Sequence, residues 1–139
     1  MATTAVEVVS PTKLLFEGEA EMVVTRSVDG DIAFLADHVA LLAALDPCVT
    51  RIVAPDGSEV RIALAGGFVE VRDNKVTILA DAAELSGDID VEQARRDLQT
   101  AIEQEHEPED PHHFSFKRWA EIRIEAAQAA AGPALTGER

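Results

Sequence analysis

Cys48 and His38 are the first pair of side chains to test for chemistry, because a thiol and an imidazole can form a nucleophile and its base. Cys48 follows Asp46-Pro47 at the predicted start of a strand. No protease-like or hydrolase-like motif surrounds it. We therefore interpret Cys48 as a half-buried structural residue rather than a nucleophile.

Gly66-Gly67 is the one glycine pair that invites comparison with a phosphate-binding loop. The segment lacks the lysine of such a loop, and no helix follows it to supply a favourable dipole. A bend or bulge between strands is the better interpretation.

Several possible metal ligands gather between residues 106 and 113. Their spacing straddles a proline-broken linker and matches no structural zinc pattern. The sequence therefore predicts a solvated linker and no metal. These side chains are His106, Glu107, Asp110, His112 and His113.

Two further groups of polar residues leave two interpretations open. Asp31 and His38 flank an apolar stretch, and they could be the polar edges of a strand and loop or part of an exposed contact loop. Lys117, Arg118 and Arg123 form a small basic face on the last predicted helix. That face could be ordinary solvated charge or could dock on an acidic partner. With no acid–base pair and no anion cradle, the chain does not read as an enzyme.

The elements that must hold these residues differ between the two parts of the chain. Up to residue 87, apolar residues alternate with period two, and turn signals recur about every ten residues, which is typical of a sandwich or barrel. The short turns predict antiparallel neighbours. The predicted strands are Val6–Val8, Glu19–Val24, Arg51–Val53, Val60–Leu64, Phe68–Val71 and Val76–Leu79.

After residue 87 the apolar spacing becomes helical. Asp90 is a suitable N-cap with Gln93 three residues later, so a capping box is predicted. A first helix ends near Glu107-Pro108, and a second begins at Asp110-Pro111 or at Ser115 and continues to Gly132. Both apolar stripes are rich in alanine, so the helices should form a hairpin of marginal stability. We expect three units: a β domain at 1–87, a helical hairpin at 88–131 and a disordered tail at 132–139.

Composition excludes several classes of function. The 139 residues carry 26 acidic and 12 basic side chains, a net charge of −14. Nucleic acids and anionic membrane surfaces would repel such a chain. The longest apolar run, Val39–Leu45, is too short to span a membrane. A single cysteine fits a reducing, cytoplasm-facing location.

Several stretches of residues 5–94 together resemble the epsilon subunit of F-type rotary ATP synthases, at the spacing found in that family. The C-terminal part resembles the family in shape alone, as two helices and a break. The matching stretches are Val6–Pro11, Phe16–Ala20, Gly30–His38, Leu41-Leu42, Gly66–Val71 and Leu79–Glu84.

The resemblance implies a fold and a place in an assembly. It implies a sandwich of two five-stranded antiparallel sheets followed by a two-helix hairpin. The sandwich would sit at the foot of the central stalk, between the gamma subunit and the ring of c subunits. There it would help couple proton flow to ATP synthesis, at the cytoplasmic face of the plasma membrane. The helices would fold down on the sandwich or extend along gamma, where they contact an acidic segment of the catalytic beta subunits and block ATP hydrolysis.

The resemblance also assigns residues. Asp31 and His38 take the acidic and histidine positions of the loop that faces the c ring, although Ala33–Asp37 lacks the glycine and proline usual there. The basic face of the last helix would meet the beta subunits. Some members bind ATP at the start of the first helix, which makes Ile89 and Asp90 nucleotide-binding candidates. Gln93 replaces the motif's arginine, so no resident cofactor is expected and the capping role of Asp90 is the alternative.

A second reading is a free-standing β-sandwich binding module. In that case the helical tail would dimerise through Phe116, Trp119 and Ile122.

Overall fold

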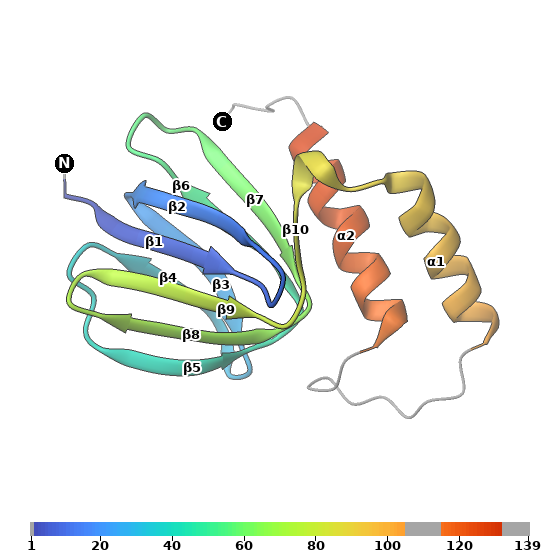
Figure 1. Ribbon diagram of the computed structural model, residues 1–139, viewed down its shortest axis with the longest axis horizontal. Helices are drawn as coiled ribbons and strands as arrows, with labels where there is room; N and C mark the ends of the chain where they lie inside the picture. The colour runs from blue at the N-terminus through green and yellow to red at the C-terminus, as the bar shows by residue number, and fades with distance from the viewer. Residues whose placement is uncertain (1, 105–114, 132–139) are drawn as a thin grey trace.

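The computed structural model describes residues 2–104 and 115–131. Ten strands form a two-layered sandwich, and two helices lie against one side of it (Figure 1). The strands are β1 (Thr4–Val9), β2 (Leu14–Ala20), β3 (Met22–Ser27), β4 (Gly30–Leu35), β5 (Leu41–Leu45), β6 (Cys48–Val53), β7 (Glu59–Leu64), β8 (Gly67–Arg72), β9 (Lys75–Ala80) and β10 (Ala83–Leu85).

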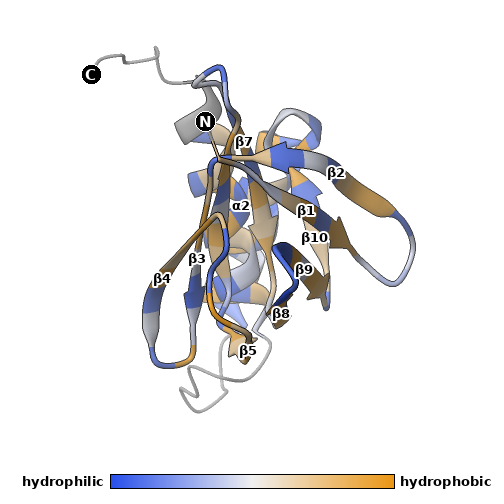
Figure 2. Cartoon of the chain, turned by 90° about the vertical axis from the view of Figure 1, so that its left-hand side faces the viewer, coloured by the Kyte–Doolittle hydropathy of each residue, from blue (hydrophilic) through white to orange (hydrophobic). Residues whose placement is uncertain are grey.

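The two five-stranded sheets that the resemblance implied are confirmed, with one connection between them. One layer has the order β10-β7-β6-β3, with β4 on the other edge of β3, and the second has the order β5-β8-β9-β1-β2. The layers are joined where β3 pairs with β5 through the single residue pair Ser27 and Leu45. The two layers are seen from another side in Figure 2.

One strand pair departs from the antiparallel sheets that the resemblance implied. β1 and β9 run parallel, with Val6 opposite Val76 and Val8 opposite Ile78. Parallel neighbours need a long connection. Here most of the sandwich lies between the two strands in sequence, so no crossover helix is required.

The predicted strand Glu19–Val24 is wrong in its extent. β2 ends at Ala20 and β3 starts at Met22, and the backbone N–H of Glu21 donates to the carbonyl of Val53 at 2.8 Å. Ala20 and Val23 both face the interior, although they are three positions apart. A single strand alternates faces with period two, so this spacing needs a change of layer at Glu21.

The core lies between the layers and is almost entirely aliphatic. Sixteen buried side chains form one continuous cluster. They come from alternate positions, as in β9, where Val76, Ile78 and Ala80 point inward. Cys48 belongs to this cluster and is more deeply buried than the half-buried position expected.

Gly66 and Gly67 lie where the chain passes from β7 in one layer to β8 in the other, so their structural role is confirmed. Gly67 has φ +140, and a Cβ there would lie 2.2 Å from the carbonyl oxygen of Leu79. Only glycine permits this close approach of two strands.

The helical arm follows the sandwich through a 3-10 turn, η1 (Ser86–Asp88). It consists of α1 (Val91–Glu103) and α2 (Phe116–Ala131), which run antiparallel, so the hairpin is confirmed. α2 packs on β6 and β7, and α1 lies on the outer side of α2 (Figure 1). Within the described residues, no helix has the length and apolar character needed to cross a membrane.

The helix ends follow local chemistry. The backbone N–H of Gln93 donates to Asp90 Oδ1 at 3.0 Å, which confirms the N-cap. The Gln93 side chain contacts Asp97 and Arg96 instead of turning back, so the second half of the capping box is not formed. Ser115 caps α2 through a hydrogen bond from the N–H of Arg118 at 3.3 Å. The other predicted start, at Asp110-Pro111, and the predicted tail lie outside the described residues.

Candidate functional site

The contact between the arm and the sandwich is the candidate functional site, and Arg123 lies at its centre. The Arg123 side chain is only 11% exposed. Its Nε donates to Glu84 of β10 at 2.6 Å, and one terminal nitrogen donates to Asp97 of α1 at 3.1 Å. One guanidinium therefore joins α2 to the sandwich and to the other helix. We call these three residues the Arg123 clamp.

Within the clamp, the pKa values of Arg123 and Asp97 are shifted. Burial lowers the pKa of Arg123, but hydrogen bonding and attraction from Glu84, and then from Asp97, outweigh it and raise the pKa. The pKa of Asp97 is lowered, first by the hydrogen bond from Gln93 and then by Arg123, against a raising effect of burial. Both shifts favour the charged forms, so the ion pairs hold across the neutral range.

A small apolar cluster lies beside the clamp. Ala63 of β7, Ile89 before α1, and Ile122 and Ala126 of α2 are buried against one another. Val49, Trp119 and Ala127 pack around them. The arm therefore rests on the sandwich through a few aliphatic contacts and one charged clamp.

This geometry corrects the prediction of a single basic face on the last helix. Arg123 points inward to the clamp, while Lys117 and Arg118 are partly exposed near the start of α2. Positions 118 and 123 are five residues apart, which places them on well-separated sides of a helix with 3.6 residues per turn. Arg123 is therefore not a surface residue in this conformation.

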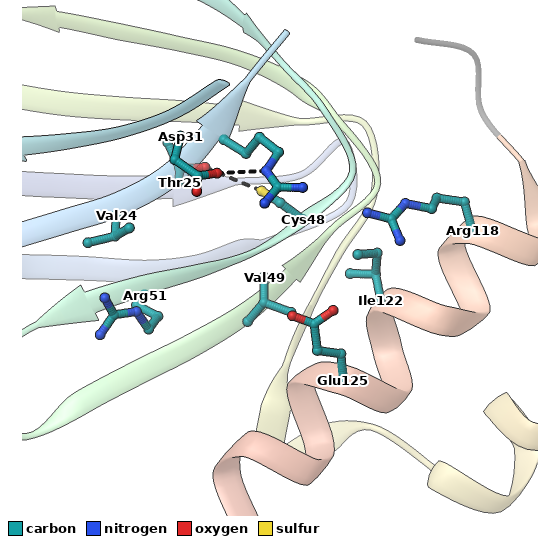
Figure 3. Close-up of a pocket in the computed structure, with 10 residues that line it drawn as sticks. Val24, Thr25, Asp31, Cys48, Val49, Arg51, Arg118, Ile122 and Glu125 are labelled. Atoms are coloured by element: carbon teal, nitrogen blue, oxygen red, sulfur yellow. Dashed lines mark hydrogen bonds and ion pairs between the residues drawn. The ribbon is translucent and has the colours of Figure 1, made fainter. Parts of the chain in front are cut away.

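Arg118 belongs to a second stripe of α2, which faces the outer surface of β3, β4 and β6. Arg118, Ile122 and Glu125 line a pocket of about 310 Å³ with residues of these strands. Arg26 and Arg51 lie on the strand side, together with Asp31. Figure 3 shows Arg118 and Glu125 reaching from the helix toward the strands, on either side of Ile122. We call this space the arginine pocket.

Asp31 and His38 are not brought together. Asp31 lies on β4 and pairs with Arg26 of β3 at 2.7 Å, whereas His38 lies in the turn beyond the other end of that strand. The His38 ring packs edge-on against Phe34, and its Nδ1 lies 2.8 Å from the carbonyl oxygen of Val39. The arrangement agrees with a strand and loop with polar edges, and a contact role for the two residues stays a prediction.

Ile89 and Asp90 have structural roles in the described chain. Ile89 is buried in the apolar cluster, and Asp90 caps α1. Gln93, at the position of the motif's arginine, holds Asp97 of the clamp at 2.8 Å. Nucleotide binding at these residues stays a prediction.

The described residues contain no group of three or more potential metal-ligating side chains. The histidines and acids between His106 and His113 lie outside the described residues.

An exposed apolar surface on the second layer was not identified from the sequence. Strand register places five apolar residues directly opposite one another across five strands. Leu14, Leu79 and Phe68 are each about half exposed, at 50%, 52% and 53%. In order across the sheet, this apolar row is Leu14, Val9, Leu79, Phe68 and Ala44.

An acidic row runs beside the apolar row. Glu17 lies opposite Glu7, Glu7 opposite Thr77, and Thr77 opposite Glu70, with exposed Leu42 at the end. The sequence contains a signal for the apolar row, because apolar residues occupy outward positions of β2, β8 and β9. Neither row could be predicted from it without the register between the strands. A soluble monomer rarely exposes such a contiguous surface, so it indicates a partner.

Comparison with known proteins identifies relatives of the whole chain. Residues 3–86 match the family model described as ATP synthase, Delta/Epsilon chain, beta-sandwich domain. The chain is 46% identical over 95 residues to the ATP synthase epsilon chain of Brevibacillus brevis, covering 68% of this chain and 72% of that one. It is 41% identical over 128 residues to the ATP synthase epsilon chain of Halalkalibacterium halodurans, covering 91% and 93%, so the likeness continues into the arm.

Solved structures show the same fold in distant proteins. A chain in the Euglena gracilis mitochondrial ATP synthase, in a structure of OSCP, F1 and the c-ring, matches with a TM-score of 0.70 and 21% identity, over 94% of this chain and 82% of that one. A chain from the central stalk and c-ring of the Tetrahymena thermophila mitochondrial enzyme matches with a TM-score of 0.51 and 17% identity, over 91% and 94%.

Proposed function

The chain belongs to the ATP synthase delta/epsilon family, whose curated members similar to it are epsilon chains, and from this we propose that it is a non-catalytic subunit of the central stalk of an F-type ATP synthase. The observation that carries the proposal is the family match over residues 3–86, on a sandwich whose outer face exposes an ordered apolar row. The sandwich would be the fixed part, and the arm the regulatory part.

The apolar row is the surface we assign to the gamma subunit. Half-exposed Phe68 and Leu79 lie side by side at its middle, and burying them would favour association by about 25 cal/mol per Å² of apolar surface. The acidic row beside it favours a partner with basic residues at the rim of an apolar patch.

The turn between β4 and β5 is the surface we assign to the c-subunit ring. Exposed Leu35, Val39 and Leu42 surround it, and His38 lies within it. Asp37 in this turn has φ +61, and its N–H donates to the side chain of Asn74 at 2.7 Å, which fixes the turn's shape. Asp31 lies at the other end of β4 and would contact the ring only where the ring also reaches the β3–β4 hairpin.

The arm is the part that we assign to inhibition of ATP hydrolysis. In the described conformation α2 lies on the sandwich, so an extended arm first requires the clamp and the apolar cluster to separate. Lys117 and Arg118 would then meet an acidic surface of the catalytic beta subunits. Release would also expose Arg123, on another side of α2 from Lys117 and Arg118.

As a peripheral subunit of this complex, the chain would lie at the cytoplasmic face of the plasma membrane. No part of it would need to enter the bilayer.

Co-purification from a cell extract tests the stalk assignment. A tagged full-length chain should bring down the gamma subunit. Phe68→Glu with Leu79→Glu should abolish this, because the change places two charges in the contact. The matched control is Arg72→Gln with Lys75→Gln, on the same outer face, which makes the same change in net charge. A tagged chain recovered alone, or equal recovery with the apolar-row variant, would contradict the assignment.

A charge reversal tests the contact with the beta subunits. Lys117→Glu with Arg118→Glu should leave assembly intact and raise ATP hydrolysis by the assembled complex. Arg95→Glu with Arg96→Glu on α1 is the control, since it makes the same change in net charge. Hydrolysis that rises equally in both variants would reject docking through α2.

The alternative, a free-standing module that dimerises through its tail, has weaker support. Of the three residues assigned to the dimer, Ile122 is buried and Trp119 packs against the chain's own cluster, while Phe116 is exposed. Sedimentation of the isolated chain as a stable symmetric dimer would revive it.

A further inference from the structure

Asn74, in the turn between β8 and β9, joins two other segments at the end of the sandwich away from the helices (Figure 1). Its side-chain oxygen accepts a hydrogen bond from the N–H of Asp37 at 2.7 Å, and its side-chain nitrogen donates to the carbonyl of Thr3 at 2.9 Å. Its backbone carbonyl accepts from the hydroxyl of Thr4 at 2.9 Å and from the N–H of Ala5 at 3.2 Å. One residue therefore holds the turn between β4 and β5 against the start of β1.

The backbone of the β8–β9 turn places the Asn74 side chain for these contacts. Asp73 and Asn74 have φ +53 and +59, the left-handed pair of a two-residue hairpin turn between Arg72 and Lys75. Asparagine tolerates this conformation better than most residues. Its short side chain lies beyond the ends of the two strands, where it reaches both neighbouring segments.

The β4–β5 turn depends on that side chain. Residues 36–40 belong to no strand, and Asp37 has φ +61, which is unfavourable for a residue with a Cβ. The turn's own backbone hydrogen bond, from the N–H of His38 to the carbonyl of Leu35, is 3.3 Å, longer than most. The bond to Asn74 is much shorter, at 2.7 Å. Its loss should leave the turn free to change shape.

The turn that Asn74 holds presents the most exposed large apolar side chain of the described residues. Val39 is 75% exposed, and Leu35, at the end of β4, is 58% exposed. A surface that is already ordered binds a partner without the entropic cost of ordering a flexible loop. A residue that fixes the turn can therefore control a contact that it does not itself make.

We propose that the c-subunit ring contacts the β4–β5 turn and the start of β1 as one surface, and that Asn74 is the residue that positions them. This inference deepens the proposed function and rests on its assignment of the turn to the ring. Asn74 acts through Asp37 and Thr3, the two residues that its side chain binds.

Photo-crosslinking in the assembled complex tests the surface. The crosslinking amino acid p-benzoylphenylalanine is placed at Val39 in the turn or at Ala2 beside β1, and both positions are exposed. In a chain with Asn74 intact, each should crosslink to c subunits. Gamma should co-purify with each chain, because the apolar row is unchanged.

Asn74→Gly tests the positioning role. Glycine keeps the positive φ of the hairpin turn and removes both side-chain hydrogen bonds. The crosslink yield from position 39 should fall about fivefold, the effect of losing one hydrogen bond that orders the turn. Asp73→Gly is the matched control, because it gives the same backbone freedom to the same turn, and its yield should be unchanged. Asn74→Asp keeps the acceptor for the N–H of Asp37 and should retain most of the yield.

Hydrogen exchange in the isolated full-length chain supplies a second readout. The amide of Asp37 should exchange about fivefold faster in Asn74→Gly, because its acceptor is gone, and at the original rate in Asn74→Asp. Circular dichroism establishes that each variant is folded. An Asp37 amide that exchanges equally in both variants would contradict the dependence of the turn on Asn74.

The competing outcomes are distinct. Equal crosslink yields from Asn74→Gly and from the chain with Asn74 intact overturn the positioning role, as does an equal loss in Asp73→Gly. A crosslink to c subunits from position 39 and none from position 2 overturns the joint surface. No crosslink to c subunits from either position, with gamma still co-purifying, contradicts the ring assignment of the proposed function and overturns the inference with it.

Discussion

The sandwich is stabilised by many more buried contacts than the packing of the arm against it. The sandwich has one continuous cluster of sixteen buried side chains, and its two layers are closed by strand pairing. The arm rests on four buried residues and one ionic clamp. Hydrophobic burial is the dominant favourable term in folding, so the sandwich should stay folded under conditions that release the arm. The proposed function requires this difference in stability, because the sandwich would stay bound to its partner while the arm is released.

A single tryptophan makes the two regions separately observable. Trp119 lies on α2 beside the apolar cluster, and its ring is 5.8 Å from the Arg123 guanidinium. Its fluorescence therefore reports whether the arm is docked, while far-UV circular dichroism, resolved into helical and strand components, reports the strands. The two signals should not coincide during unfolding by urea.

Ile78→Ala should have the largest effect, because Ile78 is fully buried in the sandwich core. Loss of its side chain leaves a cavity and should lower the free energy of unfolding by about 2–5 kcal/mol. Both the fluorescence and the dichroism transitions should move to lower urea concentration, because the arm packs on the sandwich and cannot stay docked when the sandwich unfolds. Leu79→Ala, at the exposed neighbouring position, should move neither by much. Equal shifts in the two variants would contradict the assignment of the core.

Ile122→Ala should separate the two regions. Ile122 is 1% exposed and belongs to the apolar cluster between the arm and the sandwich, not to the cluster between the two layers. The fluorescence transition should weaken by about 2–4 kcal/mol, and the dichroism transition of the strands should hold its midpoint. Ile102→Ala, at an exposed site on α1, is the control. A parallel loss in both signals would mean that arm and sandwich unfold as one unit.

Arg123→Gln should loosen the arm less than Ile122→Ala. Hydrogen bonds to charged groups are worth about 1.5–3 kcal/mol, and the clamp has two. Glu84 and Asp97 are 34% and 42% exposed, so water replaces part of what they lose, and a net cost of about 1–2 kcal/mol is expected. The fluorescence transition measures it, with Arg95→Gln as the control. An unchanged transition would mean that the clamp contributes nothing to docking.

Acid should weaken docking slightly. The pKa of Asp97 is lowered first by the hydrogen bond from Gln93, on the same helix, and then by Arg123 of α2. Only the contribution of Arg123 couples the charge of Asp97 to the clamp. This stabilisation is present at neutral pH and is lost as the pH falls through the docked pKa, below about pH 4. Trp119 fluorescence from pH 6 to pH 3 follows it, and Asp97→Asn should remove this contribution. A docked population that rises on acidification would reverse the sign of the effect.

The sequence predicted best where one periodicity governs an element. Alternation along β1, β8 and β9 predicted strands that the structure contains, and Asp90 was identified as a cap because its local chemistry suffices. Prediction failed at Glu21, where the apolar pattern continues but the chain changes layer. Nothing in a local window reports that change, because it depends on which strand supplies the next partner.

The site was harder to predict than the fold, since it depends on pairs of elements far apart in sequence. Arg123 looked like a member of a surface face until Glu84 and Asp97 were placed beside it, 39 and 26 residues away. The apolar row likewise needs the register of five strands. The sequence identified Arg118 as part of a basic group on the last helix. It did not indicate that Arg26 and Arg51 line the same pocket, because they belong to other elements.

ATP hydrolysis by the complex, assembled with the full chain or with residues 1–87 alone, tests the division of roles most directly. Gamma should bind both chains equally, because the apolar row lies wholly within the sandwich. Hydrolysis should be higher with the truncated chain, because the segment assigned to inhibition is gone. Equal hydrolysis by two complexes of the same composition, or failure of the truncated chain to assemble, would contradict a fixed sandwich with a regulatory arm.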